Sequence, residues 1–373
     1  MLRFFNFRML IAWLLSITVT FFAIGFLGNF YSSFFTILLL TFFAQSLAGL
    51  LIYRLLGKAE SLRSSQPLAF AIALALFLAL TLFVVGMFRM AMQFPSLFDA
   101  KYFILQNGQL IPFTIGSALV LPCLAWARRF VQQGNIKQTP TYLFVNEILT
   151  GALVAGFFFS VYLVFVSVFN RPAFDTDDIF FDSDGLLWRW RFVTEHTRDY
   201  YWRPMHPFVL LIIRPLVAFL SFFLKGDRLA AAFVLVALTG ALCVFLVWYF
   251  VKHTVGDSLY ALLIASLFGA STGQLVFSSL IETYVFLAAI ALIFLVLLLK
   301  DKPLIVLVIA GLITIGITIT NFAQTVIAHL LIKREIKQWI IYGLIIAALV
   351  VPLNLLNNVV YPNSQPYFFD LAA

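Results

Sequence analysis

The amino-acid sequence predicts an all-α protein that crosses a membrane many times, and three observations carry this prediction. The chain has 373 residues, of which 63% are hydrophobic and only 11% are charged, and its mean hydropathy is +1.03. Apolar runs of about 17 or more residues recur from end to end, and such runs cross a hydrocarbon core of about 30 Å as helices. These runs do not alternate polar and apolar residues, as the strands of a membrane barrel do.

Twelve apolar segments are the candidate helices. They cover residues 9–27, 34–53, 67–88, 111–127, 143–168, 205–224, 229–251, 258–276, 281–299, 303–319, 321–332 and 339–357. The first segment follows a basic start, "MLRFFNFRML", but it is long and lacks a small-residue cleavage pattern. We therefore interpret it as a retained helix rather than a cleaved signal peptide.

Basic residues between the segments predict an orientation, because Lys and Arg are in excess in cytoplasmic loops. The N-terminus is expected in the cytoplasm, together with the second and fourth inter-helix loops. The basic residues on which this depends are Arg3, Arg8, Arg54, Lys58, Arg63, Arg128, Arg129 and Lys137. The polar stretch 169–204 then falls on the outer face.

The segment 205–224 decides the topology of everything after it. If it spans the membrane, six later basic residues face outward and only Lys225 and Arg228 face inward. The six are Lys252, Lys300, Lys302, Lys333, Arg334 and Lys337. If it lies along the outer surface, the six become cytoplasmic, as the rule prefers. Arg214 near its middle also favours the interface over the bilayer centre.

The prediction is therefore about eleven spanning helices and one outer juxtamembrane helix. Residues 1–142 form an N-terminal extension of four helices, and 143–373 form a core with an outer loop at 169–228. Within 303–332, Asn321 and Gln324 interrupt an apolar stretch that is too long for one spanning helix. Two short helices that meet there explain the interruption, and broken helices at membrane depth usually line a cavity.

The outer loop concentrates polar and aromatic side chains. Seven of the sixteen acidic residues lie in its first part, 169–204, namely Asp175, Asp177, Asp178, Asp182, Asp184, Glu195 and Asp199. Aromatic rings such as Trp188 and Trp202 are interleaved with them, and such rings suit an interface and also stack on sugars. Arg203 and His206 lie beside prolines close to the membrane, where cations suit a lipid-linked phosphate. The alternative is a solvated loop whose acids balance its arginines.

Glu282 is the second unusual residue. In "QLVFSSLIETYVFL" it places a carboxylate among apolar residues at the predicted outer start of a helix. One interpretation is a carboxylate that the helix dipole favours, with Ser279 as a possible cap. The other is that Glu282 completes a site with the loop carboxylates, because an ionisable residue at membrane depth is a functional hypothesis by default.

The order of these features resembles a known family. An outward helix leads into a long outer loop with an early aspartate, "DSDGLLW". An HP element, "MHPF", and an apolar juxtamembrane helix follow, and a later helix starts with an acidic residue, "IETY". Over about 143–357 this pattern resembles the GT-C superfamily of polytopic glycosyltransferases, which includes protein O-mannosyltransferases and the aminoarabinose transferases of lipid A. The four extra helices at 1–142 and the end soon after 357 depart from the family pattern.

The resemblance implies a transfer of sugar from a polyprenyl-phosphate donor to an acceptor on the outer face of the plasma (inner) membrane. It implies that Asp184, or Asp182 as runner-up, is the catalytic loop aspartate and that His206 lies near the donor phosphate. Glu282 fits the second acidic position, and Arg203 is a plausible phosphate ligand. A divalent cation, Mg²⁺ or Mn²⁺, could be held by Asp184 and Glu282. Further substrate contacts are expected from Trp188, Trp202, Asn321 and Gln324.

Two other classes of function stay open. A non-catalytic scaffold subunit of a larger complex would fit the apolar, Phe-rich helices, and the helices at 1–142 could bind membrane-protein partners. A lipid or polysaccharide transporter would need polar residues along a path through both leaflets. The formal charge of +8 does not indicate a nucleic-acid partner, because no such binding motif accompanies it. Cys123 and Cys243 lie in apolar segments without metal-ligand spacing, so packing explains them.

Overall fold

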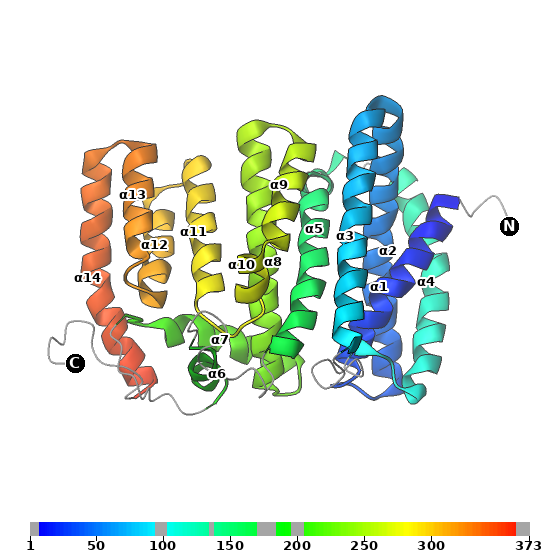
Figure 1. Ribbon diagram of the computed structural model, residues 1–373, viewed down its shortest axis with the longest axis horizontal. Helices are drawn as coiled ribbons and strands as arrows, with labels where there is room; N and C mark the ends of the chain where they lie inside the picture. The colour runs from blue at the N-terminus through cyan, green and yellow to red at the C-terminus, as the bar shows by residue number, and fades with distance from the viewer. Residues whose placement is uncertain (1–6, 94–102, 134–137, 170–183, 195–204, 363–373) are drawn as a thin grey trace. The chain divides into compact units, whose positions relative to one another are not determined.

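The computed structural model describes residues 7–93, 103–133, 138–169, 184–194 and 205–362. These residues form fourteen helices and contain no strand (Figure 1). Six of the helices are long and apolar enough to cross a membrane, namely Phe7–Leu27, Phe34–Ser65, Asn107–Phe130, Pro140–Val166, Arg228–Val255 and Ile336–Val360. An all-α polytopic membrane protein is thereby confirmed.

The chain forms two compact units, residues Met1–Ala152 (unit 1) and Leu153–Ala373 (unit 2). The division falls inside a helix, ten residues after the boundary at 142/143 that the sequence predicts. Unit 1 contains α1 (Phe7–Leu27), α2 (Phe34–Ser65), α3 (Pro67–Gln93), α4 (Asn107–Gln133) and the start of α5 (Pro140–Phe169).

The core of unit 1 alternates apolar and polar layers where α1, α2 and α4 meet. One apolar cluster contains Ile24, Ile37, Leu105 and Phe113. Another contains Met9, Val120 and Leu124. Between them along the three helices lie the buried polar side chains Ser16, Thr20, Thr41, Gln45 and Ser117, which we call the polar layer.

Unit 2 continues from α5 through nine further helices. They are α6 (Gly185–Val193), α7 (Val209–Phe223), α8 (Arg228–Val255), α9 (Ser258–Ala270), α10 (Thr272–Phe277), α11 (Tyr284–Leu299), α12 (Leu304–Ile317), α13 (Phe322–Lys333) and α14 (Ile336–Val360). The predicted helix 258–276 is wrong in one respect, because it divides at Ser271. The Ser271 side chain accepts a hydrogen bond from the backbone N–H of Gln274 and so begins α10.

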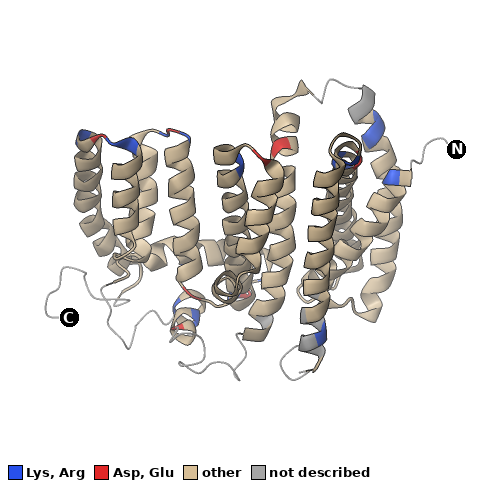
Figure 2. Ribbon diagram, turned by 45° about the horizontal axis from the view of Figure 1, so that its top comes forward, with Lys and Arg blue, Asp and Glu red and all other residues tan. Residues whose placement is uncertain are grey.

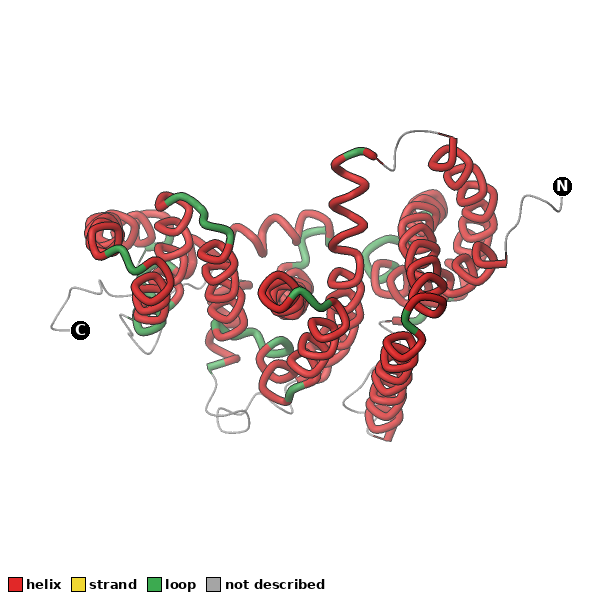
Figure 3. Tube along the Cα trace, turned by 90° about the horizontal axis from the view of Figure 1, so that it is seen from above, coloured by secondary structure: helices red, strands yellow, loops and turns green. Residues whose placement is uncertain are grey.

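Helix α7 lies across the other helices of unit 2. It contacts α6, α8, α12 and α14, and it lies across neighbours that are seen end-on in Figure 3. Its length of 15 residues is about 22 Å, at 1.5 Å per residue. The apolar helix predicted at 205–224 is thus present at Val209–Phe223, and its place along the outer surface of the membrane stays a prediction.

Basic residues gather at one end of unit 2. The α8–α9, α11–α12 and α13–α14 turns carry the six basic residues Lys252, Lys300, Lys302, Lys333, Arg334 and Lys337, and Figure 2 shows their tips in blue. The Lys333 ammonium pairs with Asp301, and that of Lys300 lies 5.1 Å from the ring centroid of Tyr249, so the three turns adjoin one another. We call this the basic end. Glu282 precedes α11 and Lys300 follows it, so Glu282 lies at the opposite end, which we call the site end.

Candidate functional site

The site end is built around Glu282, in the segment 278–283 between α10 and α11. Ser278 packs so closely against α8 that a Cβ on Gly240 would lie 2.3 Å from its hydroxyl oxygen. The Gln274 amide fixes this approach, since its Nε2 donates to Ser278 Oγ at 2.8 Å and to the Gly240 carbonyl at 3.2 Å. Glycine at position 240 and the polar "GQLVFSS" stretch therefore position Glu282.

The Glu282 carboxylate is the anchor of helix α6. Its Oε1 accepts a hydrogen bond from the backbone N–H of Asp184 at 2.9 Å. Its Oε2 accepts from the backbone N–H of Thr283 at 2.6 Å. Only 2% of Glu282 is exposed. The Glu282 carboxylate therefore fixes the backbone of Asp184, the predicted catalytic aspartate, which is the N-cap residue of α6.

Burial changes the proton affinity of Glu282, which lies outside the helices. Loss of hydration raises its pKa to about 7, because a buried carboxylate is costly to ionise. The hydrogen bond from Thr283 opposes the shift, and the nearby Asp184 carboxylate adds to it. Glu282 therefore exchanges a proton near neutral pH, whereas an ordinary glutamate is fully ionised there.

One face of α6 turns into the protein at the site end. Trp188, Arg191 and Phe192 recur at the spacing of one helix face and are each no more than 2% exposed. The Arg191 guanidinium lies 4.8 Å from the Trp188 ring centroid, and Phe192 meets Phe286 of α11 edge-on at 6.3 Å. The face combines a buried cation with aromatic walls.

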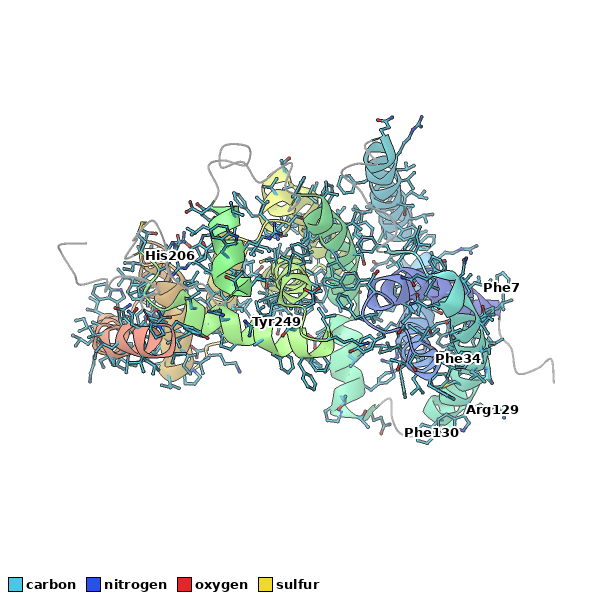
Figure 4. All side chains as sticks on the ribbon, turned by 90° about the horizontal axis from the view of Figure 1, so that it is seen from below. Phe7, Phe34, Arg129, Phe130, His206 and Tyr249 are labelled. Atoms are coloured by element: carbon cyan, nitrogen blue, oxygen red, sulfur yellow. The ribbon has the colours of Figure 1, made fainter. Side chains whose placement is uncertain are left out.

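His206 lies against the same face. Its ring meets that of Trp188 edge-on, with centroids 4.7 Å apart, and Figure 4 labels it in a view onto this end of unit 2. His206 Nδ1 lies 2.5 Å from the Ile317 carbonyl oxygen. Because a carbonyl only accepts, Nδ1 carries the proton, and Nε2 is the nitrogen that can take up a second one.

The HP element is held by the junction of α12 and α13. The Phe208 N–H donates to the Gly316 carbonyl at 3.1 Å, and the Ile319 N–H donates to the Met205 carbonyl at 3.0 Å. A Cβ on Gly316 would lie 2.1 Å from the Phe208 ring. The predicted break between 303–319 and 321–332 is thereby confirmed, and its backbone groups bind the segment around His206.

The predicted site residues fall into three groups. Asp184, Trp188, His206 and Glu282 come together at the site end through the contacts described above. Asn321 and Gln324 lie at the start of α13, where the Gln324 amide donates to the Asn321 side chain at 3.3 Å, next to the junction that holds His206. Asp182, Trp202 and Arg203 lie outside the described residues. The catalytic and binding roles of all these residues stay predictions.

Within the described residues, no three His, Cys, Asp or Glu side chains come together as a metal site would require. The predicted pair of metal ligands, Asp184 and Glu282, is adjacent. Both oxygens of Glu282 accept hydrogen bonds from backbone N–H groups, so this carboxylate already has partners other than a cation. Of the seven acidic residues counted in 169–204, all except Asp184 lie outside the described residues.

Two site residues escaped the sequence analysis. Arg191 was not singled out there, although its spacing from Trp188 is that of one helix face. Asn354 of α14 is fully buried, and its amide nitrogen donates to the carbonyl of Pro207, directly after His206. The sequence did contain a signal for Asn354, because an amide inside an apolar helix needs a hydrogen-bond partner within the protein. Searches of protein-family models, curated proteins and solved structures found no match to the chain.

Proposed function

We propose that the chain is a membrane glycosyltransferase of the GT-C type, which moves a sugar from a polyprenyl-phosphate donor to an acceptor hydroxyl. The observation that carries the proposal is the hydrogen bond between Glu282 and the backbone of Asp184. Residues 98 positions apart meet at one end of unit 2, where a donor would keep its tail in the membrane and its phosphate at the interface. The proposed topology is about eleven crossings, with the basic end in the cytoplasm and the site end outside.

Asp184 is the proposed base. The acceptor hydroxyl gives its proton to the Asp184 carboxylate, and its oxygen forms a bond to the anomeric carbon. The bond from that carbon to the donor phosphate breaks, and the polyprenyl phosphate leaves with the electron pair. One base is sufficient, because a phosphate leaving group needs no proton. Glu282 is a positioning residue, since it holds the backbone of Asp184.

The leaving phosphate gains negative charge and needs cationic or hydrogen-bonding partners. His206 is the proposed partner on the described side of the site, and its Nδ1 bond to Ile317 directs Nε2 for that role. Arg203 is the further partner that the resemblance implies. The aromatic rings of Trp188 and Trp202 are proposed to border the sugar.

The decisive experiment is sugar transfer from a polyprenyl-phosphate sugar by purified protein in lipid nanodiscs. Asp184→Asn should lower transfer by about 100-fold or more and leave the melting temperature nearly unchanged. Asp182→Asn should cost less. The matched control is Asp257→Asn at the basic end, where asparagine can replace the aspartate as the cap of α9. This control should transfer at the wild-type rate.

Each other outcome points elsewhere. Full activity of Asp184→Asn would remove Asp184 from the mechanism, and loss in Asp182→Asn alone would identify the other aspartate as the base. No transfer by the wild-type protein with any donor would favour a scaffold subunit. Movement of labelled lipid across a sealed vesicle, without transfer, would favour a transporter.

A further inference from the structure

A groove of about 230 Å³ lies between α13 and α14, away from the site end. It is lined by Val326, Trp339, Ile340, Tyr342, Gly343 and Leu344. Ile340 is 47% exposed and Leu344 is 64% exposed, so the groove opens on the outside of the bundle. In a membrane protein this surface faces lipid tails. A second helix, about 10 Å across, is too wide for a groove lined by six side chains, whereas a single hydrocarbon chain fits.

Each of the two helices that line the groove has a basic residue beside the groove, at the basic end. On α14, Lys337, Ile340 and Leu344 are spaced three and four residues apart, so they lie on one stripe. On α13, Val326 is followed by Leu330 and then, after another turn, by Arg334. Neither Arg334 nor Lys337 has an acidic partner within the described part of the chain. The neighbouring Lys333 pairs with Asp301, and the Glu335 carboxylate accepts a hydrogen bond from the neutral Gln338 amide.

Trp339 adds an unused donor to this wall. Its indole Nε1 is buried and has no hydrogen-bond partner among the described residues. A buried N–H without an acceptor is costly, and tryptophan at a membrane interface normally directs this group to a polar partner. An ester or phosphate oxygen of a lipid whose headgroup lies at Lys337 would provide the acceptor.

We propose that this groove binds one anionic phospholipid. An acyl chain lies along Ile340, Gly343 and Leu344, and the phosphate lies between Lys337 and Arg334, within reach of the Trp339 N–H. The charge selects an anionic headgroup over a zwitterionic one, because each nearby Lys or Arg favours an anionic lipid by about 1 kcal/mol. The inference is independent of the proposed transferase, since no residue of the site end takes part in it.

The test is native mass spectrometry of the purified full chain with added phosphatidylglycerol, compared with phosphatidylcholine of the same acyl chains. One phosphatidylglycerol should bind at least about fivefold more tightly than phosphatidylcholine, the effect of about one cationic contact. Gly343→Leu should abolish this binding by filling the groove. The matched control is Gly156→Leu on α5, because a Cβ at either glycine meets nothing within 4 Å. This control should bind as the wild type does.

The headgroup contact has its own pair of variants. Lys337→Gln should weaken phosphatidylglycerol binding about fivefold, whereas Lys302→Gln, exposed at the same end, should leave it unchanged. Equal binding of the two lipids by the wild type would overturn the anionic preference. Unchanged binding in Gly343→Leu would overturn the groove as the site. Displacement of the bound lipid by inorganic phosphate alone would contradict the role of the acyl chain.

Discussion

The two units differ in the kind of polar side chain that they bury. In unit 1 the polar layer lies midway along α1, α2 and α4, with an apolar cluster on each side. Unit 2 also buries ionisable groups, and two of them, Glu282 and Arg191, lie at the site end beside His206. The first set is neutral, since it consists of Ser, Thr and Gln, whereas the second set carries charge and protons.

The difference indicates two uses of polarity in a membrane. Neutral groups cost less to bury at mid-depth than charged ones do, and two of them bond within their own helix. In the polar layer, the Ser16 hydroxyl donates to the Trp13 carbonyl at 2.7 Å, and the Thr41 hydroxyl donates to the Ile37 carbonyl at 2.7 Å. Charged groups are expensive at that depth and are retained where water and substrates reach them. We therefore infer that unit 1 uses its polar layer for packing and that unit 2 uses its site end for chemistry.

The largest expected effect comes from removing the buried carboxylate of unit 2. Glu282→Ala leaves the backbone N–H groups of Asp184 and Thr283 without their acceptor. Each buried donor without a partner costs about 1 to 3 kcal/mol, so the free energy of unfolding should fall by about 3 kcal/mol or more. Transfer activity should fall about 100-fold, because Asp184 loses its anchor. The measurements are denaturant unfolding in detergent and the nanodisc transfer assay.

Glu60 in unit 1 provides the matched carboxylate. It pairs with Arg8 at 2.9 Å and is 64% exposed. An exposed pair of this kind contributes at most about 1 kcal/mol, so Glu60→Ala should have a small effect on stability and none on transfer. Equal losses in the two variants would contradict the division of roles between the units.

The pH dependence of stability provides the second test. The folded protein holds the Glu282 proton more tightly than the unfolded chain does, because its pKa is raised to about 7. This stabilisation is fully present below the unfolded pKa of about 4.3 and is lost as the pH rises through 7. It amounts to about 4 kcal/mol at about 1.4 kcal/mol per pKa unit. Unfolding at a series of pH values should show the decline, and Glu282→Gln should flatten it. A Glu282→Gln protein that declines as the wild type does would assign the effect to another group.

The third test concerns the support of His206. Gly316→Ala places a methyl group 2.1 Å from the Phe208 ring, and such overpacking typically costs about 1 to 3 kcal/mol. The HP element must then move, so transfer should fall together with stability. Gly156→Ala is the control, because its Cβ would meet nothing within 4 Å and alanine favours a helix by about 1 kcal/mol. A Gly316→Ala protein as stable as this control would disprove the close packing.

The helices were predictable from the sequence, because the length of an apolar run in a membrane protein is set by the bilayer. Asn321 also marked the break between α12 and α13. Two features were not predictable. Helix α6 lies within a polar loop. Its three buried side chains make a helical repeat that is too short to predict a helix from the sequence. The division between α9 and α10 at Ser271 depends on one hydroxyl cap, which the apolar run around it concealed.

The position of the candidate site was predictable, and its internal contacts were not. Charge counting placed Asp184 and Glu282 at one end of the same unit, and the structure brings them within one hydrogen bond. The bond joins a side chain to a backbone N–H, however, and no residue pattern encodes that. The supports at Gly316 and Asn354 arise from the packing of α12 and α14 on the HP element, which depends on tertiary structure.

The smallest expected effect concerns Gln45, at the centre of the polar layer in unit 1. It is fully buried, and its amide oxygen and nitrogen have no hydrogen-bond partner among the described residues. Gln45→Leu replaces an unsatisfied amide by an apolar group of similar size, so stability should stay the same or rise by about 1 kcal/mol. Transfer should not change. Thr41→Val is the control, because its hydroxyl already bonds to its own helix. A loss of about 2 kcal/mol or more in Gln45→Leu alone would mean that the amide binds an internal water. The polar layer would then be a hydrated site, and packing alone would no longer distinguish unit 1 from unit 2.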